Sequence, residues 1–136
     1  MQTFITKDIN ETRKWAHDLA MHLHAPTTIA LHGDLGVGKS EIARTIIQTI
    51  CGADTVVPSP TFTIVQSYVG KTDKISHFDL YRIADKAELV EIGLAHAVQN
   101  DITLIEWPDI AADILPADTV HIYISEYQDG RKIEVL

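Results

Sequence analysis

Apolar residues occur along this chain in two patterns. Some recur every three or four residues, as on one face of a helix, and others form the short runs that are typical of buried strands. The first helix is predicted after Asp8 and Glu11, which have the spacing of a capping box, and Pro26 ends it. Its apolar face consists of Trp15, Ala16, Leu19, Ala20 and Leu23. A second helix follows residues 33–40 and ends at Gly52, a plausible C-cap. Its apolar face consists of Ile42, Ala43, Ile46, Ile47 and Ile50.

Short apolar runs predict the strands. Residues 28–32 and 102–105 are typical of buried strands. Residues 64–69 and 74–78 flank a Gly-Lys-Thr-Asp turn and predict a hairpin, and residues 120–125 and 132–135 predict a final strand pair around Asp129 and Gly130. Residues 87–98 are weakly helical, whereas residues 56–62 contain Pro58 and Pro60 and must be loop or edge. Alternation of strands and helices indicates an α/β protein.

The segment from Gly33 to Ser40 has the pattern G-x-x-x-x-G-K-[ST] between a predicted strand and a predicted helix. Its glycines let backbone N–H groups turn toward phosphate oxygens, and the following helix directs its positive end to the same place. Lys39 should reach the β- and γ-phosphates, and the Ser40 hydroxyl should ligate Mg²⁺. The sequence therefore predicts a phosphate-binding P-loop that takes a nucleoside triphosphate with Mg²⁺.

Two carboxylates at predicted strand ends are candidates for the acid that such a site needs to hold the metal, Glu106 after residues 102–105 and Asp79 after residues 74–78. Glu106 follows the more uniformly buried strand and is the preferred metal acid. Asp79 is then expected to orient or deprotonate the attacking water, although which of the two ligates the metal directly stays open.

Other polar residues have weaker signals. The segment Ser59-Pro60-Thr61 lies where P-loop switch proteins sense the γ-phosphate, but a proline-stiffened connection is the plainer interpretation. Arg82 and Arg44 could stabilise transition-state charge, yet surface ion pairs are favoured for both. Trp107 could pack near the site or serve as a core aromatic. Three histidines that lack metal-ligand spacing are interpreted as surface or packing residues, namely His17, His22 and His24.

Composition narrows the function. The 136 residues suit one domain, 1–136, and 46% hydrophobic content is enough for a core. A formal charge of −8 without a basic run argues against direct, sequence-specific nucleic-acid binding. The single cysteine, Cys51, fits a reducing cytoplasm and a small side chain that is buried or half-buried. Neither a signal-peptide core nor a membrane-spanning run is present, so a cytoplasmic protein without membrane contact is expected.

Four segments together resemble the TsaE (YjeE) family, the bacterial ATPases needed to make threonylcarbamoyladenosine, t(6)A, in tRNA. In their order along the chain they are residues 33–40, residues 59–63, the block His-Phe-Asp-Leu-Tyr-Arg at 77–82, and Ile-Glu-Trp at 105–107. The 77–82 block is far more specific than the P-loop. The family usually has Thr where this chain has Ser40, and both present a hydroxyl.

The resemblance implies a P-loop NTPase-like α/β fold, in which a central, mainly parallel sheet is flanked by helices and carries antiparallel hairpin strands. It implies slow, Mg²⁺-dependent ATP hydrolysis to ADP, stimulated by two partners, TsaB and TsaD, whose assembly the ATP cycle resets. It assigns the metal to Ser40 and Glu106, catalysis to Asp79, Lys39 and Thr61, and a nucleotide-responsive loop to residues 59–61. The nucleotide is expected to contact Asp34, Leu35, Gly36, Val37, Gly38, Lys39, Ser40, Glu41 and Arg131.

Two other functions use the same motifs. A small-molecule kinase would explain the P-loop, Asp79 and Arg82, but no arginine-rich lid segment is visible. A nucleotide-sensing protein that barely turns over differs from a slow ATPase only in rate. A GTPase is disfavoured because the chain lacks an Asn-Lys-x-Asp motif.

Overall fold

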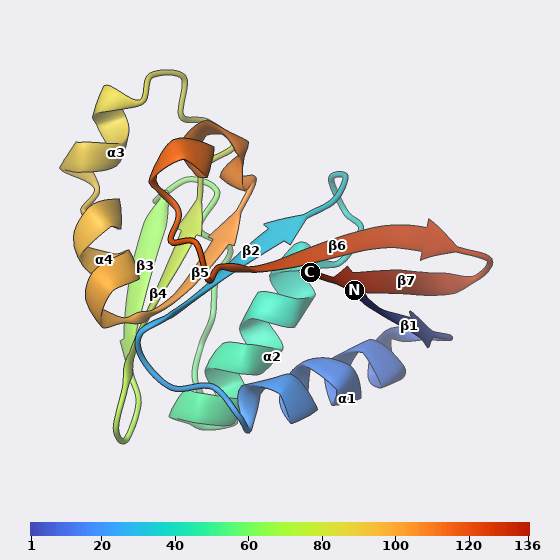
Figure 1. Ribbon diagram of the computed structural model, residues 1–136. Coiled ribbons are helices and arrows are strands. Elements are labelled where there is room, and N and C mark those ends of the chain that lie inside the picture. The colour runs from blue at the N-terminus through green and yellow to red at the C-terminus, as the bar shows by residue number, and fades with distance from the viewer.

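A seven-stranded sheet runs through the computed structural model, which describes residues 1–136, in the strand order β1-β7-β6-β2-β5-β4-β3. The elements along the chain are β1 (Gln2–Thr6), α1 (Ile9–Ala20), β2 (Thr27–His32), α2 (Lys39–Cys51), β3 (Val65–Val69), β4 (Lys74–Asp79), α3 (Ala87–Glu91), α4 (Leu94–Asn100), β5 (Ile102–Glu106), the 3₁₀ helix η1 (Pro108–Ile114), β6 (Val120–Tyr127) and β7 (Gly130–Val135). Figure 1 shows both chain ends beside β7 and β1.

The four central strands β6, β2, β5 and β4 are mutually parallel. The outer strands pair antiparallel: β3 with β4 at one edge, and β7 with β6 and with the edge strand β1 on the other side. This arrangement confirms the expected α/β fold with a parallel centre and antiparallel hairpins. Since parallel strands end at the same edge, the carboxyl ends of β2, β5 and β4 lie together. The register pairs Leu31 with Glu106 and Glu106 with Asp79. Ligands of open α/β sheets bind at such an edge.

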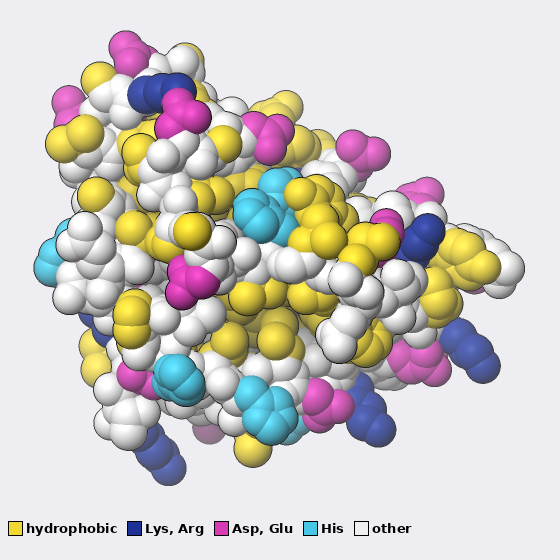
Figure 2. Space-filling model, in the orientation of Figure 1, with side chains coloured by type: hydrophobic (Ala, Val, Ile, Leu, Met, Phe, Trp, Pro, Cys, Tyr) yellow, Lys and Arg dark blue, Asp and Glu magenta, His cyan; other side chains and the backbone are white.

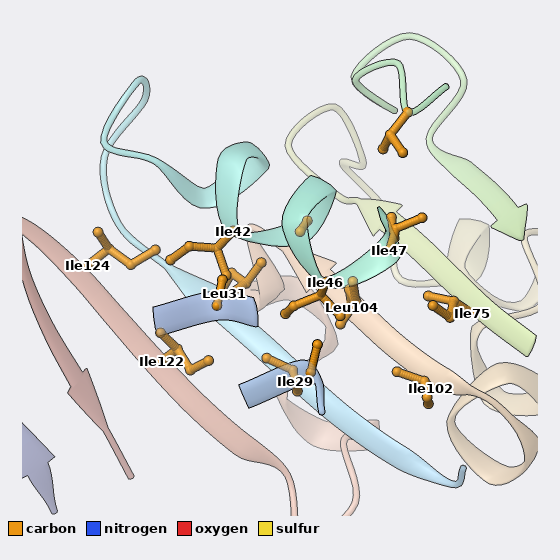
Figure 3. Packing of buried hydrophobic residues seen from close by; sticks show 14 of the residues in the cluster. Ile29, Leu31, Ile42, Ile46, Ile47, Ile75, Ile102, Leu104, Ile122 and Ile124 are labelled. Atoms are coloured by element: carbon orange, nitrogen blue, oxygen red, sulfur yellow. The ribbon is translucent and has the colours of Figure 1, made fainter. Parts of the chain in front are cut away.

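Helices cover both faces of the sheet, and each face has its own apolar core (Figure 1). The larger core joins α1 and α2 to the central strands. Figure 3 shows isoleucines of α2, among them Ile42 and Ile46, facing Ile29, Leu31 and Leu104 on the sheet. The smaller core joins α3, α4 and η1 to Phe78 and Ile105. Both faces of β5 are therefore buried, as the mainly apolar run predicted.

Local signals confirm most predicted elements. The Asp8 carboxylate accepts from the Glu11 N–H at 2.9 Å, and the Glu11 carboxylate accepts from the Lys7 N–H at 2.8 Å. Gly52 caps α2 by donating to the Gln48 carbonyl at 3.0 Å. Cys51 is half-buried, and this burial raises the pKa of its thiol. None of the helices combines the length and the apolar character that crossing a bilayer requires.

Three expectations are corrected. The sequence did not reveal β1, whose residues are mostly exposed and which is defined by its pairing with β7. The first helix stops at Ala20 rather than reaching Leu23. The helix expected over residues 87–98 is two short helices, because Gly93 takes a left-handed conformation (φ 76°) between α3 and α4. Propensity indicated helix on both sides of this glycine but did not resolve the break.

Candidate functional site

The glycine-rich loop connects β2 to α2 at the edge where the parallel strands end. Gly36 and Gly38 have φ values of 78° and 126°, a region that favours glycine, so the loop can turn its amides inward. Position 33 requires glycine for a steric reason as well, because a Cβ there would lie 2.6 Å from the Ile124 carbonyl oxygen. Asp34 and Leu35 are exposed at the tip of this loop, whereas Val37 is buried.

Lys39, the first residue of α2, is only 4% exposed. Its ammonium donates to the Gly33 carbonyl and lies 3.3 Å from the centre of the Trp107 ring, a cation–π contact. Burial lowers the pKa of Lys39, while the charges of Glu106 and Asp79 act in the opposite direction. Trp107 holds this position with a left-handed backbone (φ 56°), which is strained for a tryptophan. The structure thus places Trp107 in the site.

Glu106 ends β5 and is 2% exposed. The Ser40 hydroxyl donates to Oε1 of Glu106 at 2.9 Å, which ties the acid to the first turn of α2. Oε2 of Glu106 lies 2.7 Å from Nε2 of His77, a residue of β4 that is 1% exposed. His77 is the first residue of the His-Phe-Asp-Leu-Tyr-Arg block at 77–82, but no role was predicted for it. Its position two residues before Asp79 was the only signal of a place in the site.

Asp79 ends the neighbouring strand and is 4% exposed. The Thr61 hydroxyl donates to its Oδ2 at 3.0 Å, and the Tyr81 N–H donates to its Oδ1 at 3.0 Å. The Ser59 and Thr61 hydroxyls are 2.8 Å apart. The structure therefore brings Thr61 and Asp79 into contact, a pairing that the sequence did not predict.

Two cavities flank the first turn of α2. One, of about 250 Å³, is lined by Leu35, Gly36, Gly38, Lys39, Ser40, Glu41, Arg44, Thr61, Asp79, Glu106 and Trp107. The other, of about 310 Å³, lies between the loop, α1 and the β6–β7 turn and is lined by Asp8, Ile9, Thr12, Gly36, Val37, Gly38, Glu41, Asp129, Gly130 and Arg131. Glu41 reaches both. The residues from α1 and Asp129 were missed, since only the folded chain brings them to the loop.

Arginines at the site have separate contacts. Arg131 donates from Nε to the Val37 carbonyl at 2.6 Å, so β7 supports the loop. Glu41 is paired with Arg13 of α1 and with Arg44, which confirms the ion pair favoured for Arg44. Arg82 has no such pair; its guanidinium lies 5.5 Å from the centre of the exposed Phe62 ring, which corrects the expected ion pair. The histidines His17, His22 and His24 are exposed, as expected.

The donor set fits Mg²⁺ better than a transition metal. Ser40 and Glu106 offer a hydroxyl and a carboxylate oxygen side by side, and no group of three His, Cys, Asp or Glu side chains is arranged to hold a metal alone. Mg²⁺ commonly takes one or two protein oxygens and completes its shell with water and substrate phosphates.

Comparison with known proteins gives one family. The family model described as Threonylcarbamoyl adenosine biosynthesis protein TsaE matches residues 6–133. The tRNA threonylcarbamoyladenosine biosynthesis protein TsaE of Rickettsia bellii is 36% identical over 132 residues, covering 97% of this chain and 91% of the relative. The Haemophilus influenzae protein of the same name is 40% identical over 119 residues, covering 87% and 75%. The crystal structure of Bacillus subtilis YdiB is similar with a TM-score of 0.77 at 25% identity, covering 97% of this chain and 82% of YdiB.

Proposed function

Because this chain belongs to the TsaE family of threonylcarbamoyl adenosine biosynthesis proteins, we propose that it binds ATP and hydrolyses it slowly in support of t(6)A modification of tRNA. One observation carries this proposal. The buried ammonium of Lys39, the Ser40 hydroxyl and the carboxylates of Asp79 and Glu106 surround one cavity beside a glycine-rich loop. This is the set of groups that phosphoryl transfer uses.

The triphosphate lies along the loop in this proposal. Backbone N–H groups of residues 34–38 and the N-terminus of α2 face its oxygens. Lys39 exchanges the Gly33 carbonyl for the β- and γ-phosphates, whose negative charge compensates the burial that lowers the pKa of this lysine. The nucleoside end occupies the cavity of about 310 Å³, against Arg131 and the first turn of α1.

Ser40 and Glu106 are the residues that hold Mg²⁺ in this proposal. When bound, the ion neutralises charge on the β- and γ-phosphate oxygens. A hydroxyl oxygen has lone pairs beside its O–H, so Ser40 would ligate the ion through its oxygen and could still donate its proton to Oε1 of Glu106, as it does here.

Asp79 orients the attacking water. It lies beside Glu106 at the strand edge, and Thr61 from the 59–61 segment donates to one of its oxygens. The water oxygen attacks the γ-phosphorus in line and gives a proton to the Asp79 carboxylate, the bond to the β-phosphate oxygen breaks, and ADP and inorganic phosphate leave. Thr61 links this acid to an exposed loop, so binding of the γ-phosphate and rearrangement of that loop are coupled.

The partners in this proposal are homologues of TsaB and TsaD, whose assembly the ATP cycle switches between states. Support comes from the site's position beside exposed groups that a partner can reach, among them Leu35, Phe62 and Tyr81, which are 81%, 83% and 58% exposed. Tyr81 packs against Trp107, which lines the same cavity as Leu35, so exposed side chains of the kind that partners bind adjoin the site.

An assay of ATP hydrolysis tests the proposal, with wild type and Lys39→Ala each measured with and without TsaB and TsaD. We expect slow hydrolysis by wild type, faster hydrolysis with both partners, and none by Lys39→Ala. If wild type with both partners releases no phosphate, or Lys39→Ala retains the rate, the proposal is wrong. A screen for phosphorylated small molecules in the same reactions distinguishes the kinase alternative.

A further inference from the structure

His77 is a buried histidine that apolar packing does not explain. Its side chain is 1% exposed, and Nδ1 has no hydrogen-bond partner. An unpartnered polar atom in a core is unfavourable, so an apolar side chain would satisfy this position better if filling space were its only role. The one polar contact of the ring is therefore the feature that has to account for a histidine here.

That contact is with Glu106. Nε2 lies 2.7 Å from Oε2, and because a carboxylate oxygen only accepts, Nε2 is the nitrogen that carries the proton. Glu106 consequently receives one donor on each oxygen, His77 on Oε2 and Ser40 on Oε1. With both oxygens engaged, the carboxylate plane is fixed.

We propose that His77 is a positioning residue for the metal acid: its hydrogen bond to Oε2 holds Glu106 so that Oε1 faces the Ser40 hydroxyl and the cation. This inference rests on the proposed function, in which Ser40 and Glu106 hold Mg²⁺. Of the two donors to Glu106, Ser40 would itself be a metal ligand, so His77 is the donor whose contribution is to orient the carboxylate. Outer partners of this kind orient metal ligands, and their loss weakens metal affinity.

Three substitutions separate positioning from packing. His77→Met has a similar volume and no donor. His77→Gln carries an amide N–H at the reach of Nε2, so it retains the hydrogen bond to Glu106. His77→Asn is polar, but its amide ends near the position of Nδ1 and falls short of Glu106. If His77→Met fails to fold, as judged by circular dichroism, His77→Asn replaces it as the donor-free variant.

The measurement is binding of the non-hydrolysable analogue AMP-PNP by calorimetry across a series of MgCl₂ concentrations. We expect the donor-free variant to need about tenfold more Mg²⁺ for half-maximal tight binding. Its affinity for AMP-PNP in EDTA should equal that of wild type, because His77 lines neither cavity and acts only through Glu106, whose proposed role is to hold the metal. His77→Gln should restore the wild-type Mg²⁺ dependence, which a purely structural role would not predict.

The outcomes distinguish the two levels of the argument. If wild type binds AMP-PNP with Mg²⁺ and the donor-free variant shows the same Mg²⁺ dependence, the inference about His77 is overturned and the proposed function stands. If His77→Gln behaves like His77→Met, the hydrogen bond is not the cause and the inference is overturned as well. If wild type itself binds no AMP-PNP at any Mg²⁺ concentration, the proposed function fails and the inference fails with it.

Discussion

At the scale of residues, the two buried acids differ in what their oxygens contact. The Glu106 carboxylate is held by Ser40 of α2 and by His77 of β4, and both of these elements belong to the rigid core. Asp79 is held by the Tyr81 N–H and by Thr61, which belongs to a loop. A carboxylate that the core holds in place is suited to bind a metal ion. A carboxylate that is hydrogen-bonded to a loop is suited to a catalytic step that depends on the position of that loop. This contrast favours Glu106 as the metal acid, the assignment preferred from the sequence.

Asp79→Asn should therefore reduce turnover and spare binding. The amide keeps the size of the carboxylate and can still accept from Thr61, but it is a poor acceptor for a proton from water. We expect the rate of ATP hydrolysis to fall about 100-fold or more, while the affinity for Mg²⁺-ADP stays near that of wild type. Steady-state phosphate release and calorimetry measure the two quantities. Loss of nucleotide binding in Asp79→Asn would instead make Asp79 the metal ligand.

His32 makes the free energy of unfolding depend on pH. Burial lowers the pKa of this imidazole from 6.5, the nearby His121 lowers it further, and Asp109 partly opposes both. The folded state thus binds fewer protons than the unfolded state below pH 6.5, so stability is lost as the pH falls from 6.5 through the lowered pKa. We expect His32→Gln to lose less stability than wild type over this range, as measured by urea unfolding.

The exposed His22 is the matched control for that experiment. His22→Gln should follow the wild-type pH dependence. An identical acid response of His32→Gln and wild type would show that burial of His32 does not contribute to it.

The residues of the site could be predicted because their types and spacing carry the chemistry. Lys39, Ser40, Asp79 and Glu106 each follow from a motif or a strand end, and the structure brings all four to one cavity. Their neighbours could not be predicted, since contacts such as Trp107 over Lys39 and His77 on Glu106 depend on strand order and backbone strain. Neither contact can be inferred before the order of the strands in the sheet is known.

At the scale of elements, the predictable parts are those whose pattern is local. Strand β5 is a short, mainly apolar run, α2 has a buried face and ends at Gly52, and the β3–β4 hairpin has a turn sequence between its two strands. Strand β1 lacks such a pattern because its residues are exposed on both faces except Thr6, and its place is set by register with β7. The order β2-β5-β4, which creates the site, is likewise a long-range property.

The junction of β1 and β7 supplies a prediction about stability. Gly130 starts β7 so close to the end of β1 that an added Cβ would fall on the Thr6 carbonyl oxygen and within 2.9 Å of the Lys7 Cα. Both are backbone atoms, which cannot move aside without disturbing the pairing of β1. Gly130→Ala should therefore cost about 1–3 kcal/mol of unfolding free energy, measured by urea denaturation.

Asp129→Ala changes the adjacent, exposed position and should leave the urea midpoint within error of wild type. Equal midpoints for Gly130→Ala and Asp129→Ala would mean that β1 adjusts freely, and the tight approach would not be a constraint on the fold.

At the scale of the whole molecule, the net negative charge of this chain disfavours direct binding to the tRNA that its family helps to modify. There are 19 acidic residues against 11 Lys and Arg, and the face in Figure 2 shows the basic side chains as isolated groups near its edges. Three arginines and Lys39 are also engaged around the proposed nucleotide site, as Arg13, Arg44 and Arg131 contact Glu41 or the loop. The seven other Lys and Arg residues are spread along the sequence from Lys7 to Lys132, and the 19 acidic residues that outnumber them repel a phosphate backbone.

The isolated protein should consequently bind tRNA no more tightly than about 100 µM at near-physiological salt, the weak end of non-specific binding. Titration of fluorescently labelled tRNA, followed by anisotropy, measures this affinity for the chain alone, for TsaB with TsaD, and for all three together. We expect tRNA binding to require the partners and to be unchanged by Lys39→Ala in the chain alone. Micromolar binding by the isolated chain that weakens steeply with added salt would contradict this expectation, because it would require a basic surface that faces the phosphates directly.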